Sequence, residues 1–143
     1  MLKFTRSVKK GRGQYSYDSA PDIHKKIVTL LKKCEADWIN PRRIFCVRSV
    51  NAKTRAYARI WGLAKIWQRT LNISPSYIIE VISEKFDKVI SREQDKILIH
   101  EICHIPRNFS GSLLPHIRRG KNSFSKKVST LINHYANNSN TRK

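Results

Sequence analysis

The chain has few acidic residues for its length. It carries 29 Lys and Arg against 10 Asp and Glu in 143 residues, so its formal net charge is +19 at pH 7. Acidic residues are absent from both ends: residues 1–13 hold five basic residues and no acid, and residues 117–143 hold seven and no acid. Basic segments of this kind bind phosphate backbones without sequence preference. We therefore expect a basic flexible arm over residues 1–18, and nucleic acid as a second partner of the basic termini.

Long hydrophobic runs and cysteine pairs are also missing. No run of about 18 apolar residues exists, which argues against a membrane-spanning helix, and residues 1–13 lack the apolar core of a secretory signal. The cysteines, Cys34, Cys46 and Cys103, cannot all pair, and none has C-x-x-C spacing. This argues against a disulfide framework and favours reduced thiols. The sequence predicts a cytoplasmic protein with no membrane partner, and nothing in it sets the oligomeric state.

The most informative stretch is His100-Glu101-Ile102-Cys103-His104, an H-E-x-x-H pattern inside an apolar run. Residues four apart lie on one face of a helix, so His100 and His104 can reach the same metal ion. Glu101 then lies beside that metal, where it can take a proton from water. The pattern is typical of a hydrolase with one catalytic Zn²⁺, most often a peptidase. The alternative is that both histidines are ordinary, partly buried side chains bonded to the backbone.

The residues around this pattern predict a helix over residues 91–105. Ser91 and Gln94 have the spacing of a capping box at a helix start. Apolar residues then form a stripe beside the histidines, and Pro106 ends the helix. The stripe consists of Ile97, Leu98, Ile102 and Ile105.

A catalytic zinc usually has three protein ligands, so a third must come from outside this helix. His116 is the best candidate, because it follows a turn-like segment in which Gly111 can adopt the positive φ that reverses the chain. His134, in a predicted C-terminal helix, is the second candidate, and His24 is less favoured. The carboxylates of Glu80 and Glu84 stay open as alternatives.

The rest of the chain predicts one α+β domain over residues 19–136. A first amphipathic helix begins near Ser19 and Asp22, which have capping-box spacing, and ends before Asn40. Three strands follow, over residues 43–50, 56–63 and 77–82, with a short connection at residues 65–71. The strands predict a small, three- to four-stranded twisted sheet packed against helices, with the H-E-x-x-H helix following it. Residues 137–143 form a polar tail that we expect to be disordered.

Between Pro41 and His116 the chain resembles the phage and archaeal metallopeptidase domain family, whose members are zincin-like. The resemblance rests on residues 43–49, 58–63, 77–82, 86–88 and 100–106, with Phe109-Ser110-Gly111 and Pro115-His116. It implies a zincin-like fold, zinc at His100, His104 and His116, and Glu101 as the catalytic base. Cys103 departs from the family pattern, in which leucine is commoner at that position.

Together these observations predict a zinc metallopeptidase that hydrolyses protein or peptide substrates and acts near nucleic acid. The alternative is a basic nucleic-acid-binding protein in which a fourth protein ligand, from Cys34, Cys46 or His134, closes a structural zinc site. Arginines near the predicted strands would then form the nucleic-acid face with Tyr57 and Trp61, or they are simply solvated beside core aromatics. These arginines are Arg43, Arg48, Arg55 and Arg59.

Overall fold

The computed structural model describes residues 13–117, 119–120 and 123–140. Its elements, in chain order, are β1 (Ser16–Ser19), α1 (Pro21–Lys33), the 3-10 helix η1 (Pro41–Arg43), β2 (Ile44–Val50), β3 (Ala58–Gly62), α2 (Lys65–Leu71), β4 (Tyr77–Ile82), α3 (Ser83–Phe86), α4 (Ser91–Ile102) and α5 (Phe124–Asn140).

The strands form one four-stranded mixed sheet in the order β1-β2-β4-β3. The central pair, β2 and β4, is parallel, with Ile44 opposite Tyr77, whereas β1 and β3 pair antiparallel with their neighbours. Strand β3 is therefore an edge strand, although it lies between β2 and β4 in the chain. The predicted α+β class with a three- to four-stranded sheet is confirmed.

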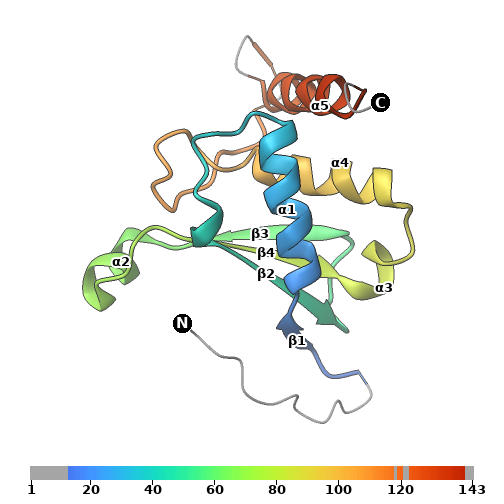
Figure 1. Ribbon diagram of the computed structural model, residues 1–143. Coiled ribbons are helices and arrows are strands. Elements are labelled where there is room, and N and C mark those ends of the chain that lie inside the picture. The colour runs from blue at the N-terminus through green and yellow to red at the C-terminus, as the bar shows by residue number, and fades with distance from the viewer. Residues whose placement is uncertain (1–12, 118, 121–122, 141–143) are drawn as a thin grey trace.

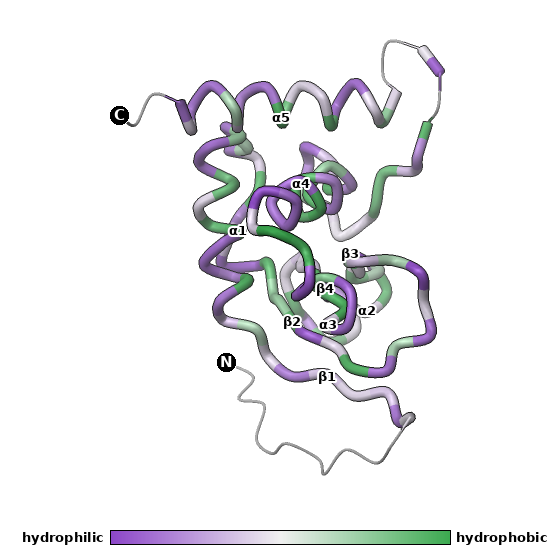
Figure 2. The backbone as a smooth tube through the Cα atoms, turned by 90° about the vertical axis from the view of Figure 1, so that its right-hand side faces the viewer, coloured by the Kyte–Doolittle hydropathy of each residue, from purple (hydrophilic) through white to green (hydrophobic). Residues whose placement is uncertain are grey.

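Helices α1, α4 and α5 lie on the same side of the sheet, with α5 farthest from it (Figures 1 and 2). Strand residues alternate between the two sides, so Ile79 and Val81 of β4 face the helices and are fully buried. They belong to the same buried cluster as Ile27 of α1 and Leu98 of α4, which are equally inaccessible. This one-sided core fixes the position of α4, and with it the position of the H-E-x-x-H residues.

Two terminal segments are more ordered than the sequence predicts. Residues 16–18, assigned to the flexible arm, belong to β1, because the main chain of Ser16–Ser19 pairs with Val47–Val50 at the edge of β2. Residues 137–140, assigned to the disordered tail, continue α5, and Asn138 Nδ2 donates to the carbonyl oxygen of Lys33 at 2.7 Å. The remainder of both predictions, at residues 1–12 and 141–143, lies outside the described residues.

Both predicted capping boxes are wrong. Ala20 is the residue before α1, and Ser19 ends β1 instead of capping the helix. Ile90 precedes α4, and the Ser91 hydroxyl accepts from Lys26 Nζ of α1 at 2.8 Å. Gln94 also bonds outside its helix, donating to the carbonyl oxygen of Phe86 at 3.1 Å. Tertiary contacts between elements thus replace the local caps.

Helix α1 is shorter than predicted and ends at Lys33, because Glu35 turns the chain out of the helix with φ of 56°. The three cysteines are free and buried, and burial raises the pKa of each thiol to about 12, so they are inert at neutral pH. Each helix within the described ranges is too short or too polar to cross a lipid bilayer.

Candidate metal centre and cleft

Helix α4 presents the H-E-x-x-H residues at its C-terminal end. Leu98, Ile99 and Ile102 are buried in the core and fix the rotation of the helix about its axis. The helix ends at Ile102, so His104 lies one turn on, where its backbone N–H donates to the carbonyl oxygen of Glu101 at 3.1 Å. The predicted helix over 91–105 is therefore three residues too long, yet the tight turn keeps His104 on the same side as His100.

A loop after α4 brings His116 back to this turn. Gly111 has a φ of 93°, as predicted for the position where the chain reverses. Leu114, in the returning part of the loop, is bonded to His104 twice: Leu114 N–H donates to the His104 carbonyl oxygen at 2.7 Å, and His104 Nδ1 lies 2.6 Å from the Leu114 carbonyl oxygen. These two bonds set His116 beside α4.

His100, His104 and His116 form a cluster in which one ligand nitrogen from each lies within 4.8 Å of the others. The Nε2 atoms of His100 and His116 are 3.2 Å apart. A zinc–nitrogen bond of about 2.0–2.1 Å in a tetrahedral site places two ligand nitrogens about 3.4 Å apart. The cluster is therefore compact enough for three imidazoles to hold one metal ion.

The electrostatics of the cluster favour neutral imidazoles, which is the form that binds metal. Burial lowers the pKa of His100, and the neighbouring His104 and His116 lower it further. Burial also lowers the pKa of His104, although its bond to Leu114 acts in the opposite direction. Since Leu114 C=O can only accept, His104 Nδ1 carries the proton and Nε2 keeps a free lone pair.

Phe124, the first residue of α5, packs against all three histidine rings. Its ring centroid lies 4.4 Å from His104, 4.6 Å from His116 and 4.8 Å from His100. Phe124 is itself buried, so it limits the rotation of the imidazoles. Sequence reasoning missed this residue, because nothing local to Phe124 indicates that α5 begins beside the cluster.

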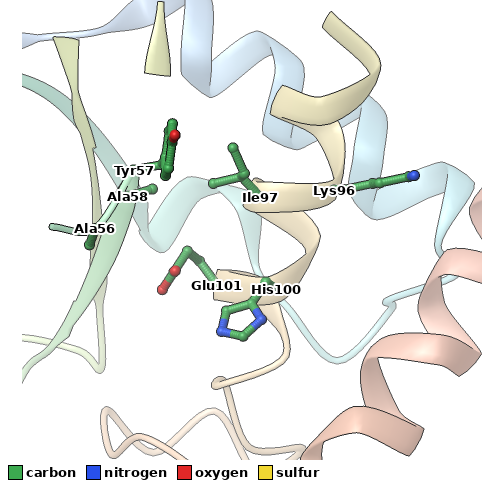
Figure 3. A pocket seen from close by; sticks show the side chains of 7 residues that line it. All are labelled: Ala56, Tyr57, Ala58, Lys96, Ile97, His100 and Glu101. Atoms are coloured by element: carbon green, nitrogen blue, oxygen red, sulfur yellow. The ribbon is translucent and has the colours of Figure 1, made fainter. Parts of the chain in front are cut away.

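Glu101 faces a cleft between α4 and the edge strand β3 (Figure 3). The cleft has a volume of about 360 Å³ and is lined by Ala56, Tyr57, Ala58, Lys96, Ile97, His100 and Glu101. Glu101 is only 8% exposed, and burial raises the pKa of its carboxyl to about 7. A carboxyl with such a pKa can both accept and release a proton near neutral pH.

The loop that carries His116 is anchored at the end of the sheet by Tyr77. Its hydroxyl accepts from the Gly111 N–H and donates to the Ser112 carbonyl oxygen, both at 2.8 Å, and its ring meets Phe109 edge-on. Gln68 adds a bond from Nε2 to the Ser110 carbonyl oxygen at 2.9 Å. The loop is thus held both at its turn, by Tyr77 and Gln68, and after the turn, by the bonds between Leu114 and His104.

The other candidate ligands lie elsewhere. His134 Nδ1 is 2.6 Å from Glu35, and His24 Nε2 is 2.9 Å from the Pro41 carbonyl oxygen. Glu80 is on the sheet face that points away from the helices, where Arg59 donates to it at 2.8 Å. Glu84 accepts from the Asn51 backbone N–H at 2.7 Å.

Comparison with known proteins gives one family match. Residues 15–134 match the family described as "Putative phage metallopeptidase". The comparisons with curated proteins and with solved structures found no match. The matched range contains the sheet, helix α4 and all three histidines of the cluster. A match over this much of the sequence means that the chain belongs to the phage metallopeptidase family.

Proposed function

We propose that this protein is a zincin-like, zinc-dependent peptidase, in which His100, His104 and His116 hold the metal and Glu101 is the general base. The observation that carries the proposal is the cluster of three imidazoles at the end of α4, with a buried carboxyl next to it in an open cleft. Three protein ligands, with a fourth position left for water, are the mark of a catalytic zinc site.

The donor set fits zinc. Imidazole nitrogen is a preferred zinc ligand, and the His104 ring is oriented by the Leu114 carbonyl oxygen in the manner that second-shell acceptors orient metal-bound histidines. When bound, zinc lowers the pKa of water towards about 7 and polarises a carbonyl group.

Glu101 supplies the proton transfers. Its carboxylate takes a proton from the water that attacks the peptide carbonyl, and it later returns that proton to the departing amine. The raised pKa of Glu101 in the protein without metal comes from burial, and it suits a group that must serve as base and then as acid. Lys96 and Tyr57 line the same cleft, where they would contact a bound peptide.

The edge strand β3 supports an extended peptide as the substrate. β3 pairs on one side with β4, and its first residue, Ala58, lines the cleft opposite Glu101, together with Ala56 and Tyr57 just before the strand. A peptide added alongside such an edge is bound through main-chain hydrogen bonds, independently of its sequence. This arrangement would place the peptide beside His100 and Glu101, which line the same cleft.

The alternative, a basic nucleic-acid-binding protein with a structural zinc, needs a fourth ligand that the described part of the chain does not place at the cluster. Within the described residues, the group that could hold a metal comprises only the three histidines. His134 is paired with Glu35, and the buried Cys34 and Cys46 are not in that group. A structural site would also have no use for a buried carboxyl facing an open cleft.

The first test is the metal content of the purified protein by elemental analysis, with three proteins in parallel. We expect about one zinc per chain in the wild type and in His134→Ala, and a loss of zinc in His116→Ala. His134→Ala is the matched control, because it removes a histidine of the same chain that lies outside the cluster. No zinc in the wild type after zinc has been supplied would refute the proposal.

The second test separates metal binding from catalysis. Glu101→Gln should keep its zinc and lose hydrolysis of a fluorescently labelled casein by about 10²–10⁴-fold, the range expected for a general base. Unchanged hydrolysis in Glu101→Gln would show that another group takes the proton.

A further inference from the structure

The side of the sheet that faces away from α1, α4 and α5 carries aromatic and aliphatic side chains that remain exposed. We call this side the open face and define it by Tyr17, Phe45, Trp61 and Ile78. Their exposed fractions are 50%, 43%, 48% and 41%. Exposed aromatics gathered on one sheet face indicate a surface that binds something flat or apolar.

The register of the sheet arranges these residues in rows. Phe45, Ile78 and Trp61 lie opposite one another on β2, β4 and β3 and form one continuous row. Neighbouring strands are about 4.8 Å apart, so the row is about 10 Å wide. Tyr17 of β1 lies opposite Ser49 of β2, four residues along from Phe45. The exposed rings therefore lie at two separate positions on one surface.

Arginines accompany the rings of the first row. The Arg59 guanidinium lies 5.1 Å from the centre of the Trp61 ring, and the Arg43 guanidinium lies 5.8 Å from that of Phe45. Arg43 is held by neutral groups, donating to the carbonyl oxygens of Ser74 and Pro75 and to the Ser76 hydroxyl. None of these partners is a carboxylate, so these bonds leave the positive charge of Arg43 beside Phe45 without a neutralising partner among them.

Acidic charge on this face is compensated. Glu80 lies between the two positions, but it is 1% exposed and accepts hydrogen bonds from Arg59, Trp61 and Tyr15. The sequence that leads into β1, residues 1–12, contains five basic residues and no acid, and the whole chain has a net charge of +19. The open face thus combines exposed rings, arginines beside them and an excess of positive charge.

We propose that the open face binds single-stranded nucleic acid, with bases stacked on Phe45, Trp61 and Tyr17 and phosphates near Arg43. Stacking of bases on aromatic side chains within a basic surface is the usual mode of single-strand binding and needs no base-specific hydrogen bonds. A double helix keeps its bases stacked inside and cannot offer them to a flat sheet. The proposal is independent of the peptidase assignment, because it requires neither metal nor Glu101.

The sequence predicts some residues of this surface and misses others. Of the residues considered there for a nucleic-acid face, Arg43, Arg59 and Trp61 do lie on the open face. Arg48 does not, because it faces the helices and donates to Asp22 at 2.9 Å and to Asp87. Tyr57 lines the cleft beside Glu101. Phe45 and Tyr17 also belong to the open face, and only the strand register reveals this.

The test is fluorescence anisotropy of a labelled 12-nucleotide oligothymidylate with the full chain, at several salt concentrations. We expect Phe45→Ala and Tyr17→Ala each to weaken binding about fivefold or more. Tyr57→Ala is the matched control: Tyr57 is 45% exposed, close to the 50% of Tyr17, but lies at the cleft, and its replacement should leave the affinity within twofold of the wild type. Tyr17 and Phe45 are on different strands, so a folding defect in one variant leaves the other as a test.

Two further measurements, with duplex DNA and with poly-glutamate, complete the test of the open face. A 12-base-pair duplex should bind more weakly than the single strand, and poly-glutamate should compete poorly. If both surface variants bind the oligonucleotide as the wild type does, binding comes from the basic termini alone and the proposal is refuted. Equal affinity for the duplex would also refute it, and effective competition by poly-glutamate would identify an acidic protein as the partner instead.

Discussion

Replacing Tyr77 with phenylalanine tests whether its hydroxyl holds the loop that carries His116. Tyr77 is 1% exposed, and its hydroxyl makes two hydrogen bonds of 2.8 Å, to the Gly111 N–H and the Ser112 carbonyl oxygen. Phenylalanine keeps the ring and its contact with Phe109 but leaves both backbone groups without this partner. A buried hydrogen bond contributes about 1 kcal/mol net, so Tyr77→Phe should lower the free energy of unfolding by about 2 kcal/mol.

If the three histidines hold zinc as proposed, the same change should weaken zinc binding, because the loop then supplies one ligand while α4 and its final turn supply the other two. If the two bonds restrain the loop directly, the lost free energy corresponds to a zinc Kd higher by up to about 30-fold. Urea unfolding followed by circular dichroism measures the first quantity. Competition with a chromogenic chelator measures the second.

Tyr135→Phe is the matched control for Tyr77→Phe. The Tyr135 hydroxyl donates to Asp95 at 2.7 Å and joins α5 to α4, away from the loop. Its removal should reduce stability by about 1 kcal/mol and leave the zinc Kd unchanged. A Tyr77→Phe protein with the zinc Kd of the wild type would refute the reasoning, whatever its stability.

Three other changes test separate parts of the structure. In Gly62→Ala the new methyl group would overlap the Gly111 carbonyl oxygen in the loop that carries His116. Thermal unfolding should therefore show a loss of stability of about 1–3 kcal/mol, and an unchanged melting temperature would mean that this loop moves aside without cost. Burial acts to raise the pKa of Glu80, but hydrogen bonds from Arg59, Ser49, Trp61 and Tyr15 outweigh it and hold that pKa at about 2, against the ordinary 4.5. The ionised carboxylate therefore stabilises the fold above pH 4.5 by about 3 kcal/mol, and this is lost as the pH falls towards 2. Glu80→Gln should remove that part of the pH dependence in urea titrations between pH 2 and pH 5, and an unaltered slope would contradict the assignment. Finally, a chelator should lower the melting temperature of the wild type but not of His116→Ala, and equal shifts in both would exclude the histidine cluster as the stabilising site.

The sequence predicts the parts of the site that depend on local geometry. His100 and His104 are four residues apart, and the reversal at Gly111 is close enough to return His116 to the same turn. The strand over residues 77–82 is also predicted with its observed bounds, because its apolar run is bounded by a proline and by polar residues. Each of these inferences requires only neighbouring residues.

The contacts missed by sequence reasoning are those between distant segments. Strand β1 has the short, polar sequence Ser-Tyr-Asp-Ser and becomes a strand only through pairing with β2. The capping boxes were wrongly predicted because Ser19 belongs to β1 and because Ser91 and Gln94 bond to α1 and α3 instead of to their own helix. Phe124 and Tyr77 reach the histidine cluster and its loop from α5 and β4, and no local pattern reveals either contact.

The histidine cluster comes from a single continuous segment, residues 100–116. A chain that has lost its tertiary structure therefore keeps its three imidazoles within 17 residues of one another in sequence. If these imidazoles bind zinc as proposed, the unfolded chain retains some affinity for the metal. Stabilisation by a ligand depends on the ratio of its affinities for the folded and unfolded chain. On that proposal, zinc should raise the unfolding free energy by less than its Kd for the folded protein implies. A newly made chain would then be able to bind the metal before β4 and α5 have packed around it.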